Sequence, residues 1–156
     1  MIELVVPDAE AMEGLGARLA GLLRPGDLVQ LDGELGAGKT TLTRGLGAAL
    51  GAREPITSPT FVLAREHPTA SGVTLVHVDA YRLGSAAELD DLDLDWDGAI
   101  VVVEWGAGKL AESDRIVVQI ERPAGGDPLA EEAPRHVRIT GVGERWAGLE
   151  AALVSN

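Results

Sequence analysis

The sequence has no cysteine, so disulfide bonds and thiolate metal sites are excluded and nothing in it requires an oxidising compartment. Aromatic residues make up only 3% of the chain, so the core must be built from Leu, Val, Ile and Ala. No apolar run approaches the roughly 18 residues of a membrane span, and the N-terminal stretch MIELVVPDAEAMEG has no basic leader region. We therefore expect a cytoplasmic protein.

Basic residues are also scarce. The chain has 13 Lys and Arg against 25 Asp and Glu, which gives a formal net charge of −12. Such a surface repels a phosphate backbone, so unaided binding to RNA or to anionic lipid is disfavoured, and a partner protein should hold any RNA that is involved. The length of 156 residues predicts a single domain over 1–156, large enough to bury a core.

Glycine, by contrast, is concentrated in the stretch that organises the chain, Leu28 to Leu50, which reads LVQLDGELGAGKTTLTRGLGAAL. Within it Gly33, Gly38, Lys39 and Thr40 fit the P-loop pattern G-x-x-x-x-G-K-[ST], with an apolar strand before it and an amphipathic helix after it. Residues without a Cβ let the backbone turn its N–H groups inward around a phosphate. The stretch therefore predicts a nucleotide site.

Each part of this motif has an expected role. The Lys39 ammonium can lie against the terminal phosphates, the Thr40 hydroxyl is placed to ligate Mg²⁺, and the helix N-terminus adds partial positive charge. The guanine-reading sequence N-K-x-D does not occur, which favours ATP over GTP. The residues expected to surround the nucleotide are Glu34, Leu35, Gly36, Ala37, Gly38, Lys39, Thr40 and Thr41.

The remaining pattern predicts an α/β fold, a P-loop nucleotidase with a central mixed β-sheet flanked by helices. The expected strands are Ile2 to Val6, Leu28 to Leu31, Phe61 to Glu66, Val73 to Asp79, Ala99 to Val103, Arg115 to Glu121 and His136 to Thr140. Besides the P-loop helix, the expected helical segments are one from the N-cap Asp8 to Leu23, a short one at Ser85 to Leu89, and a last one from Arg145 to Val154.

Two acids end apolar strands, Asp79 and Glu104. A P-loop nucleotidase needs a carboxylate at such a position to complete the Mg²⁺ shell, and both residues qualify. The uninterrupted apolar run Ala99 to Val103 favours Glu104, because it is more typical of a central strand beside the P-loop strand. Asp79 would then position or deprotonate the attacking water, although the sequence allows the two roles to be exchanged.

Other polar segments have less specific meanings. Ser58 or Thr60, in a loop that two prolines keep irregular, could sense the γ-phosphate. His77 by itself is read as a hydrogen-bonded strand residue and Arg82 as an ion-pair partner. The acidic segment from Asp90 to Asp97 is interpreted as a solvated face.

Four segments together resemble the motifs of the bacterial TsaE family, the small P-loop ATPase required to make threonylcarbamoyladenosine in tRNA. They are GELGAGKTT at 33–41, SPT at 58–60, HVDAYR at 77–82 and VEW at 103–105, in family order and spacing. The resemblance spans Gly26 to Gly106 and fades after Trp105. The H-x-D-x-Y-R and V-E-W pieces are specific, whereas a P-loop alone is not.

The resemblance implies that Lys39 and Thr40 contact the phosphates and Mg²⁺, and that Glu104 is a metal ligand. It also implies that Thr60 lies in a switch loop and that Asp79 is needed for activity. The implied partners are a TsaD-like transferase and a TsaB-like kinase-fold protein, through which tRNA would be reached.

Two alternative functions stay open. A small-molecule P-loop kinase is disfavoured because Lys109 is the one basic residue between Arg82 and Arg115, which leaves no basic lid. A nucleotide-gated binding module without turnover would differ from the ATPase only in whether it hydrolyses ATP.

Overall fold

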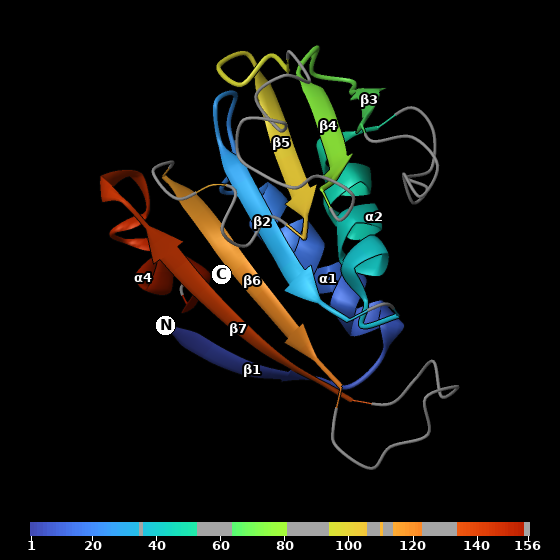
Figure 1. Cartoon of the computed structure of the whole chain (residues 1–156), viewed down its shortest axis with the longest axis vertical. Helices are drawn as coiled ribbons and strands as arrows, with labels where there is room; N and C mark the ends of the chain where they lie inside the picture. Colours follow the sequence, from blue (N-terminus) through green and yellow to red (C-terminus); the bar gives the residue numbers. More distant parts are fainter. Residues whose placement is uncertain are drawn as a thin grey trace.

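One mixed β-sheet forms the centre of the computed structural model, which describes residues 1–34, 36–52, 64–80, 94–105, 110, 114–122 and 134–154. Its strands are β1 (Ile2–Val6), β2 (Leu28–Gly33), β3 (Ala64–Pro68), β4 (Thr74–Asp79), β5 (Ala99–Glu104), β6 (Arg115–Glu121) and β7 (Arg135–Val142), shown in Figure 1. The helices are α1 (Ala9–Ala20), α2 (Lys39–Leu50), the 3-10 helix η1 (Glu144–Trp146) and α4 (Leu149–Val154).

The strand order is β1-β7-β6-β2-β5-β4-β3. The four central strands β6, β2, β5 and β4 run parallel, and β1, β7 and β3 pair antiparallel to their neighbours. The predicted mixed sheet flanked by helices is therefore confirmed. Because parallel strands place their carboxyl ends at one edge, the chain leaves β2, β4, β5 and β6 on the same side of the sheet.

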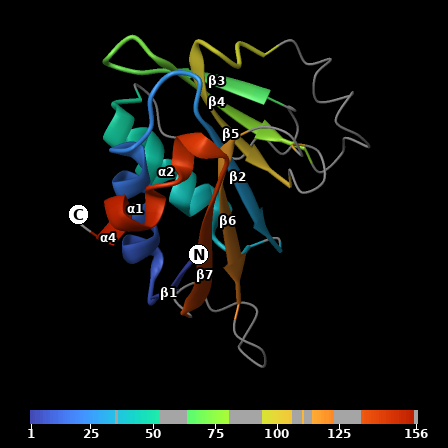
Figure 2. The ribbon, with the colours of Figure 1, turned by 90° about the vertical axis from the view of Figure 1, so that its left-hand side faces the viewer.

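Helices α1, α2 and α4 lie on one face of the sheet, as Figure 2 shows. Between them and the strands lies a buried apolar cluster of Leu, Ile, Val and Met, with Trp146 as its large aromatic member. A second cluster covers the opposite face of β2, β5 and β4, so that all six residues of β5 are buried. Among the described residues, every helix is too short or too polar to span a membrane.

Helices α1 and α2 touch through glycines. A Cβ built on Gly16 would lie 2.0 Å from the carbonyl oxygen of Leu42, and one built on Gly45 would lie 1.9 Å from that of Glu13. Real atoms cannot approach so closely, so only glycine fits at these two positions. The same residues that lower helix propensity therefore allow the two backbones to pack against each other.

Several element boundaries differ from the sequence prediction. The cap is as expected, since the Asp8 carboxylate accepts a hydrogen bond from the Ala11 N–H at 2.8 Å, but α1 ends at Ala20 instead of reaching Leu23. Strand β3 continues to Pro68, so the turn begins later than expected. The predicted C-terminal helix is broken into η1 and α4, with Gly148 between them. Residues 53–63 and 81–93, and with them Ser85 to Leu89, lie outside the described part.

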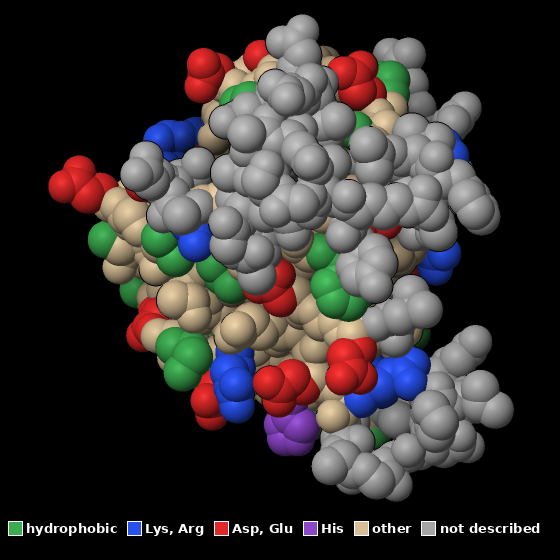
Figure 3. Space-filling view, in the orientation of Figure 1, with side chains coloured by type: hydrophobic (Ala, Val, Ile, Leu, Met, Phe, Trp, Pro, Cys, Tyr) green, Lys and Arg blue, Asp and Glu red, His purple; other side chains and the backbone are tan. Residues whose placement is uncertain are grey.

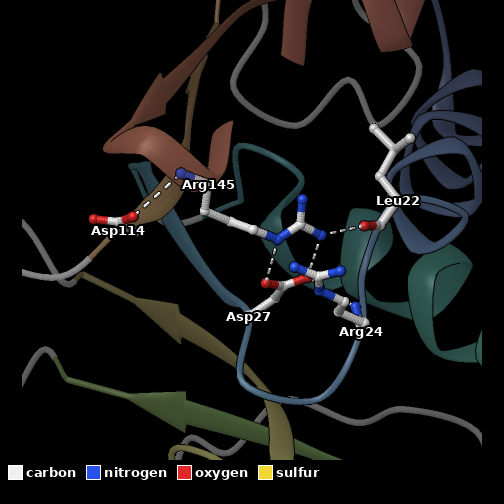
Figure 4. Close-up of polar contacts among 5 residues, drawn as sticks. All are labelled: Leu22, Arg24, Asp27, Asp114 and Arg145. Atoms are coloured by element: carbon white, nitrogen blue, oxygen red, sulfur yellow. Dashed lines mark hydrogen bonds and ion pairs between the residues drawn. The ribbon is translucent and has the colours of Figure 1, made fainter. Parts of the chain in front are cut away.

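A cluster of hydrogen bonds and an ion pair connects several segments of the chain at the amino end of β2, as Figure 4 shows. The Arg145 guanidinium donates to both carboxylate oxygens of Asp27, at 3.1 and 3.0 Å, and to the carbonyl oxygen of Leu22 at 3.1 Å. The Arg24 N–H also donates to Asp27, at 2.8 Å, and the Arg145 N–H donates to Asp114 at 3.3 Å. Segments far apart in sequence are therefore joined at one buried carboxylate.

Replacing Arg145 with alanine should lower the free energy of unfolding by about 2 kcal/mol, because the Asp27 side chain is only 6% exposed and would lose its guanidinium partner. The measurement is a denaturant or thermal unfolding curve. Arg138→Ala is the matched control, because its ion pairs with Glu3 (3.5 Å) and Glu121 (3.4 Å) are exposed and should contribute less than about 1 kcal/mol. Equal midpoints for both variants would contradict a stabilising role for the buried pair.

The surface opposite the helices carries mixed charge. Figure 3 shows acidic and basic side chains lying next to one another along the lower border of this face. The net charge of −12 is therefore not spread as a uniform negative surface over this border.

Candidate functional site

The P-loop lies between β2 and α2, as the sequence predicted. Strand β2 ends at Gly33, and Gly38 immediately precedes the first residue of α2. Gly36 and Gly38 have φ angles of 78° and 121°, which side chains with a Cβ rarely adopt. The loop therefore has a backbone conformation at these two glycines that most other residues could adopt only with strain. Leu35 lies outside the described residues.

Lys39 points back over this loop. Its Nζ donates hydrogen bonds to the carbonyl oxygens of Gly33 and Glu34, the second at 3.1 Å, and lies 4.0 Å from the centre of the Trp105 ring. Burial lowers the pKa of the Lys39 ammonium, and the nearby carboxylates of Glu104, Asp79 and Asp32 partly oppose that shift. The ammonium is therefore buried, held by carbonyl oxygens and close to three acids.

The two acids singled out from the sequence are neighbours at the carboxyl edge of the sheet. Asp79 ends β4 and Glu104 ends β5, and the two are register partners in the parallel pair. Glu104 is also paired with Leu31 of β2, so β5 is the strand beside the P-loop strand and β4 lies one strand farther out. The predicted central position of the Ala99 to Val103 run is confirmed.

Glu104 has a buried partner whose role the sequence did not reveal. The Nε2 atom of His77 lies 2.9 Å from Oε2 of Glu104, and both side chains are buried. His77 Nδ1 is buried without a hydrogen-bond partner in the part of the chain that the structure describes. A carboxylate oxygen accepts, so Nε2 donates this hydrogen bond and thereby orients the carboxylate. The sequence carried one signal for this contact, because strand side chains alternate between the two faces and residues 77 and 79 therefore lie on the same face of β4.

A third acid near Lys39 was missed from the sequence. Asp32 precedes the P-loop on β2, and its Oδ2 atom accepts a hydrogen bond from Gln30 Nε2 at 2.6 Å, while Arg115 Nε donates to Gln30 Oε1 at 2.8 Å. Its other oxygen, Oδ1, is buried and has no partner within the described ranges. A buried acceptor in this state favours a cation or a water nearby.

Two arginines that were also missed contact the loop from the side of β6 and β7. Arg122 follows β6 and donates to the carbonyl oxygen of Gly36, and Arg135 begins β7 and donates to that of Ala37. No local motif marks them, because they lie far from the loop in the sequence and approach it only through the sheet order.

The structure thus brings Lys39, Asp79 and Glu104 to one edge of the sheet, with Thr40 in the first turn of α2. Ser58, Thr60 and Arg82 lie outside the described residues. Of the residues that are described, no three His, Asp or Glu side chains form a group that could hold a metal ion by themselves.

Comparison with known proteins gives a consistent result. A family model described as "Threonylcarbamoyl adenosine biosynthesis protein TsaE" matches residues 6–127. The tRNA threonylcarbamoyladenosine biosynthesis protein TsaE of Streptomyces coelicolor is 56% identical over 150 residues, covering 92% of this chain and 99% of that protein. The protein of the same name from Bacillus subtilis is 33% identical over 140 residues, covering 88% and 84% of the two chains.

A solved structure agrees with these relatives. The crystal structure of Bacillus subtilis YdiB matches with a TM-score of 0.74 and 30% sequence identity, covering 99% of this chain and 94% of that one. The P-loop, the parallel strands that carry the two acids, and the matches over most of the chain therefore agree, and the chain belongs to the TsaE family of tRNA threonylcarbamoyladenosine biosynthesis proteins.

Proposed function

We propose that this protein binds ATP with Mg²⁺ and hydrolyses it, and that turnover serves a partner complex that modifies tRNA. The observation that carries the proposal is the buried Lys39 ammonium, which lies over the P-loop beside the carboxylates that end β4 and β5. Phosphoryl transfer requires a cation that contacts the phosphates, an acid that binds the metal ion and an acid that positions the attacking water. The partners proposed are a TsaD-like transferase and a TsaB-like kinase-fold protein.

The residues fit a nucleotide phosphate. The positive φ angles at Gly36 and Gly38 and the start of α2 directly after Gly38 make a backbone concavity at a helix N-terminus. The Lys39 contacts with Gly33 and Glu34 would be exchanged for phosphate oxygens, which form stronger, charge-assisted hydrogen bonds. We assign Glu34 to Thr41 to this contact.

The donor set also fits Mg²⁺. Thr40 supplies a hydroxyl and Glu104 a carboxylate, both oxygen donors, and the ion normally takes its other ligands from water and phosphates. When bound, Mg²⁺ would neutralise charge that develops on the phosphates. His77 holds Oε2 of Glu104, so the carboxylate is oriented before the ion arrives.

Asp79 is assigned to the attacking water. It is half-buried at the end of β4, next to Glu104 and within the field of Lys39, where a carboxylate can accept a proton or a hydrogen bond from water. Thr60 is assigned to sensing the γ-phosphate.

Access to tRNA is proposed to go through the partners. A formal charge of −12 opposes direct binding of a phosphate backbone at physiological salt. The hydrolysis step would then reset the partner complex, and the protein itself need not read RNA.

Lys39→Ala should weaken Mg·ATP binding by about tenfold to a hundredfold, because a charge-assisted hydrogen bond is worth about 1.5 to 3 kcal/mol. Isothermal titration calorimetry with wild type and variant measures the change. Arg138→Ala removes the same charge from an exposed site on β7 and should bind as the wild type does.

Unchanged ATP affinity in Lys39→Ala would contradict the proposed site. Binding without hydrolysis, both alone and with the TsaB-like and TsaD-like partners present, would contradict the ATPase and favour the nucleotide-gated module.

A further inference from the structure

Two arginines hold consecutive carbonyl groups of the P-loop. Arg122 Nε and Nη2 donate to the Gly36 carbonyl oxygen at 3.2 and 2.8 Å, and Arg135 Nε donates to the Ala37 carbonyl oxygen at 3.0 Å. The two arginines are far apart in the chain from the loop, and they reach it because β6 pairs with β2 and β7 pairs with β6. The contact is therefore a product of the sheet order.

Holding a carbonyl group also fixes the next N–H group. The peptide unit is planar, and none of the described peptide bonds is cis, so each N–H points opposite to the carbonyl oxygen of the residue before it. Arg135 therefore directs the Gly38 N–H away from itself. Arg122 does the same for the Ala37 N–H, which donates to the Glu34 carbonyl oxygen at 3.0 Å and closes a turn.

The position of Gly36 shows how closely Arg122 lies against the loop. A Cβ built on Gly36 would be 2.5 Å from Arg122 Nη2. The guanidinium thus occupies the space that a side chain at residue 36 would fill. The φ angle of 78° at Gly36 also favours glycine at this position.

The pair also places positive charge behind the loop. Arg135 is buried, and burial followed by repulsion from Arg122 lowers the pKa of its guanidinium. Two like charges beside the loop are unfavourable by themselves, and a bound polyphosphate would relieve the repulsion. The pair thus adds two positive charges next to the loop in a chain of net charge −12.

We propose that Arg122 and Arg135 are positioning residues that keep the P-loop in its phosphate-binding shape before the nucleotide arrives. The inference rests on the proposed nucleotide site and adds to it two residues from the opposite end of the sequence. They act through the loop backbone, so ATP and ADP, which share the α- and β-phosphates that the loop N–H groups contact, should depend on them equally.

The test compares Arg122→Ala, Arg122→Lys and Arg135→Lys with wild type by calorimetry with Mg·ATP and with Mg·ADP. Arg122→Ala should weaken both nucleotides by about tenfold, because a charge-assisted contact that shapes the loop is lost. Arg122→Lys should recover part of the affinity, since lysine keeps the charge but has one nitrogen where arginine donates to the carbonyl from two. Arg138→Ala, three residues from Arg135 on β7, controls for charge alone and should bind as wild type does.

A second readout needs no nucleotide. Amide hydrogen exchange of the peptide that covers residues 33–41 should be faster in Arg122→Ala than in wild type or Arg138→Ala, while the thermal midpoint stays the same. Because Arg122 is only half-buried, its alanine variant should fold even where Arg135→Lys does not.

Four outcomes would overturn the inference. They are unchanged affinity and unchanged loop exchange in Arg122→Ala, an equal loss in Arg138→Ala, full recovery of affinity in Arg122→Lys, and a loss for ATP without a loss for ADP. The last would mean a direct γ-phosphate contact. If the wild type bound neither nucleotide, the proposed function would fail and this role would fail with it, whereas a binding wild type with unaffected variants contradicts the positioning role alone.

Discussion

Gly45→Ala should destabilise the protein by about 3 kcal/mol or more and lower its melting temperature by roughly 6 to 12 °C. The added methyl group would lie 1.9 Å from the Glu13 carbonyl oxygen, a backbone atom of α1 that cannot rotate away. The two helices would have to separate, and the apolar cluster that they cover would lose contact with them. Gly16→Ala should behave alike, since its methyl group would lie 2.0 Å from the Leu42 carbonyl oxygen. Thermal unfolding measures both.

Gly14→Ala is the matched control, because Gly14 lies in α1 like Gly16 and a Cβ built on it meets nothing within 4 Å. It should stabilise the protein by about 0.5 to 1 kcal/mol, the ordinary gain when alanine replaces glycine inside a helix. If all three variants melted at similar temperatures, close backbone packing would not explain the glycines.

The variants Glu104→Gln and Asp79→Asn should distinguish the roles of the two acids. Glu104→Gln keeps its shape but loses its charge, so about tenfold more Mg²⁺ should be needed for nucleotide binding, and turnover should fall by about a hundredfold. Asp79→Asn should leave Mg·ATP binding within about twofold of wild type and reduce turnover by about a hundredfold, the pattern of an interaction made in the transition state. Nucleotide titrations at several Mg²⁺ concentrations and partner-stimulated turnover give both quantities.

Glu66→Gln, an exposed acid on β3, removes the same charge away from the site and should change neither quantity. A raised Mg²⁺ requirement in Asp79→Asn but not in Glu104→Gln would reverse the two roles. Variants that match wild type in binding and turnover would place both acids outside the active site.

Much of the fold followed from local pattern. The P-loop required a strand before Gly33 and a helix after Gly38, and both are present. The position of β5 beside β2 also followed from the sequence, because the run Ala99 to Val103 is apolar at every residue and must be covered on both faces.

The features that were missed are those set by contacts between distant segments. Arg122 and Arg135 reach the P-loop only after β6 and β7 pair with the sheet, and His77 meets Glu104 only when β4 lies against β5. Boundaries were wrong where the end of an element tightens into a turn, as in α1, which ends at Ala20 before the C-cap Gly21. The roles of Ser58 and Thr60, and the single domain over 1–156, stay predictions.

The two outermost strands of the sheet bear on self-association. An edge strand exposes backbone hydrogen-bonding groups that can pair with another chain and start aggregation. Strand β3 ends in Pro68, which has no N–H to offer, and its Arg65 and Glu66 side chains are exposed. Strand β1 is five residues long and carries Glu3, which pairs with Arg138 of β7. Both edges therefore carry features that discourage the addition of a strand from another copy of the chain.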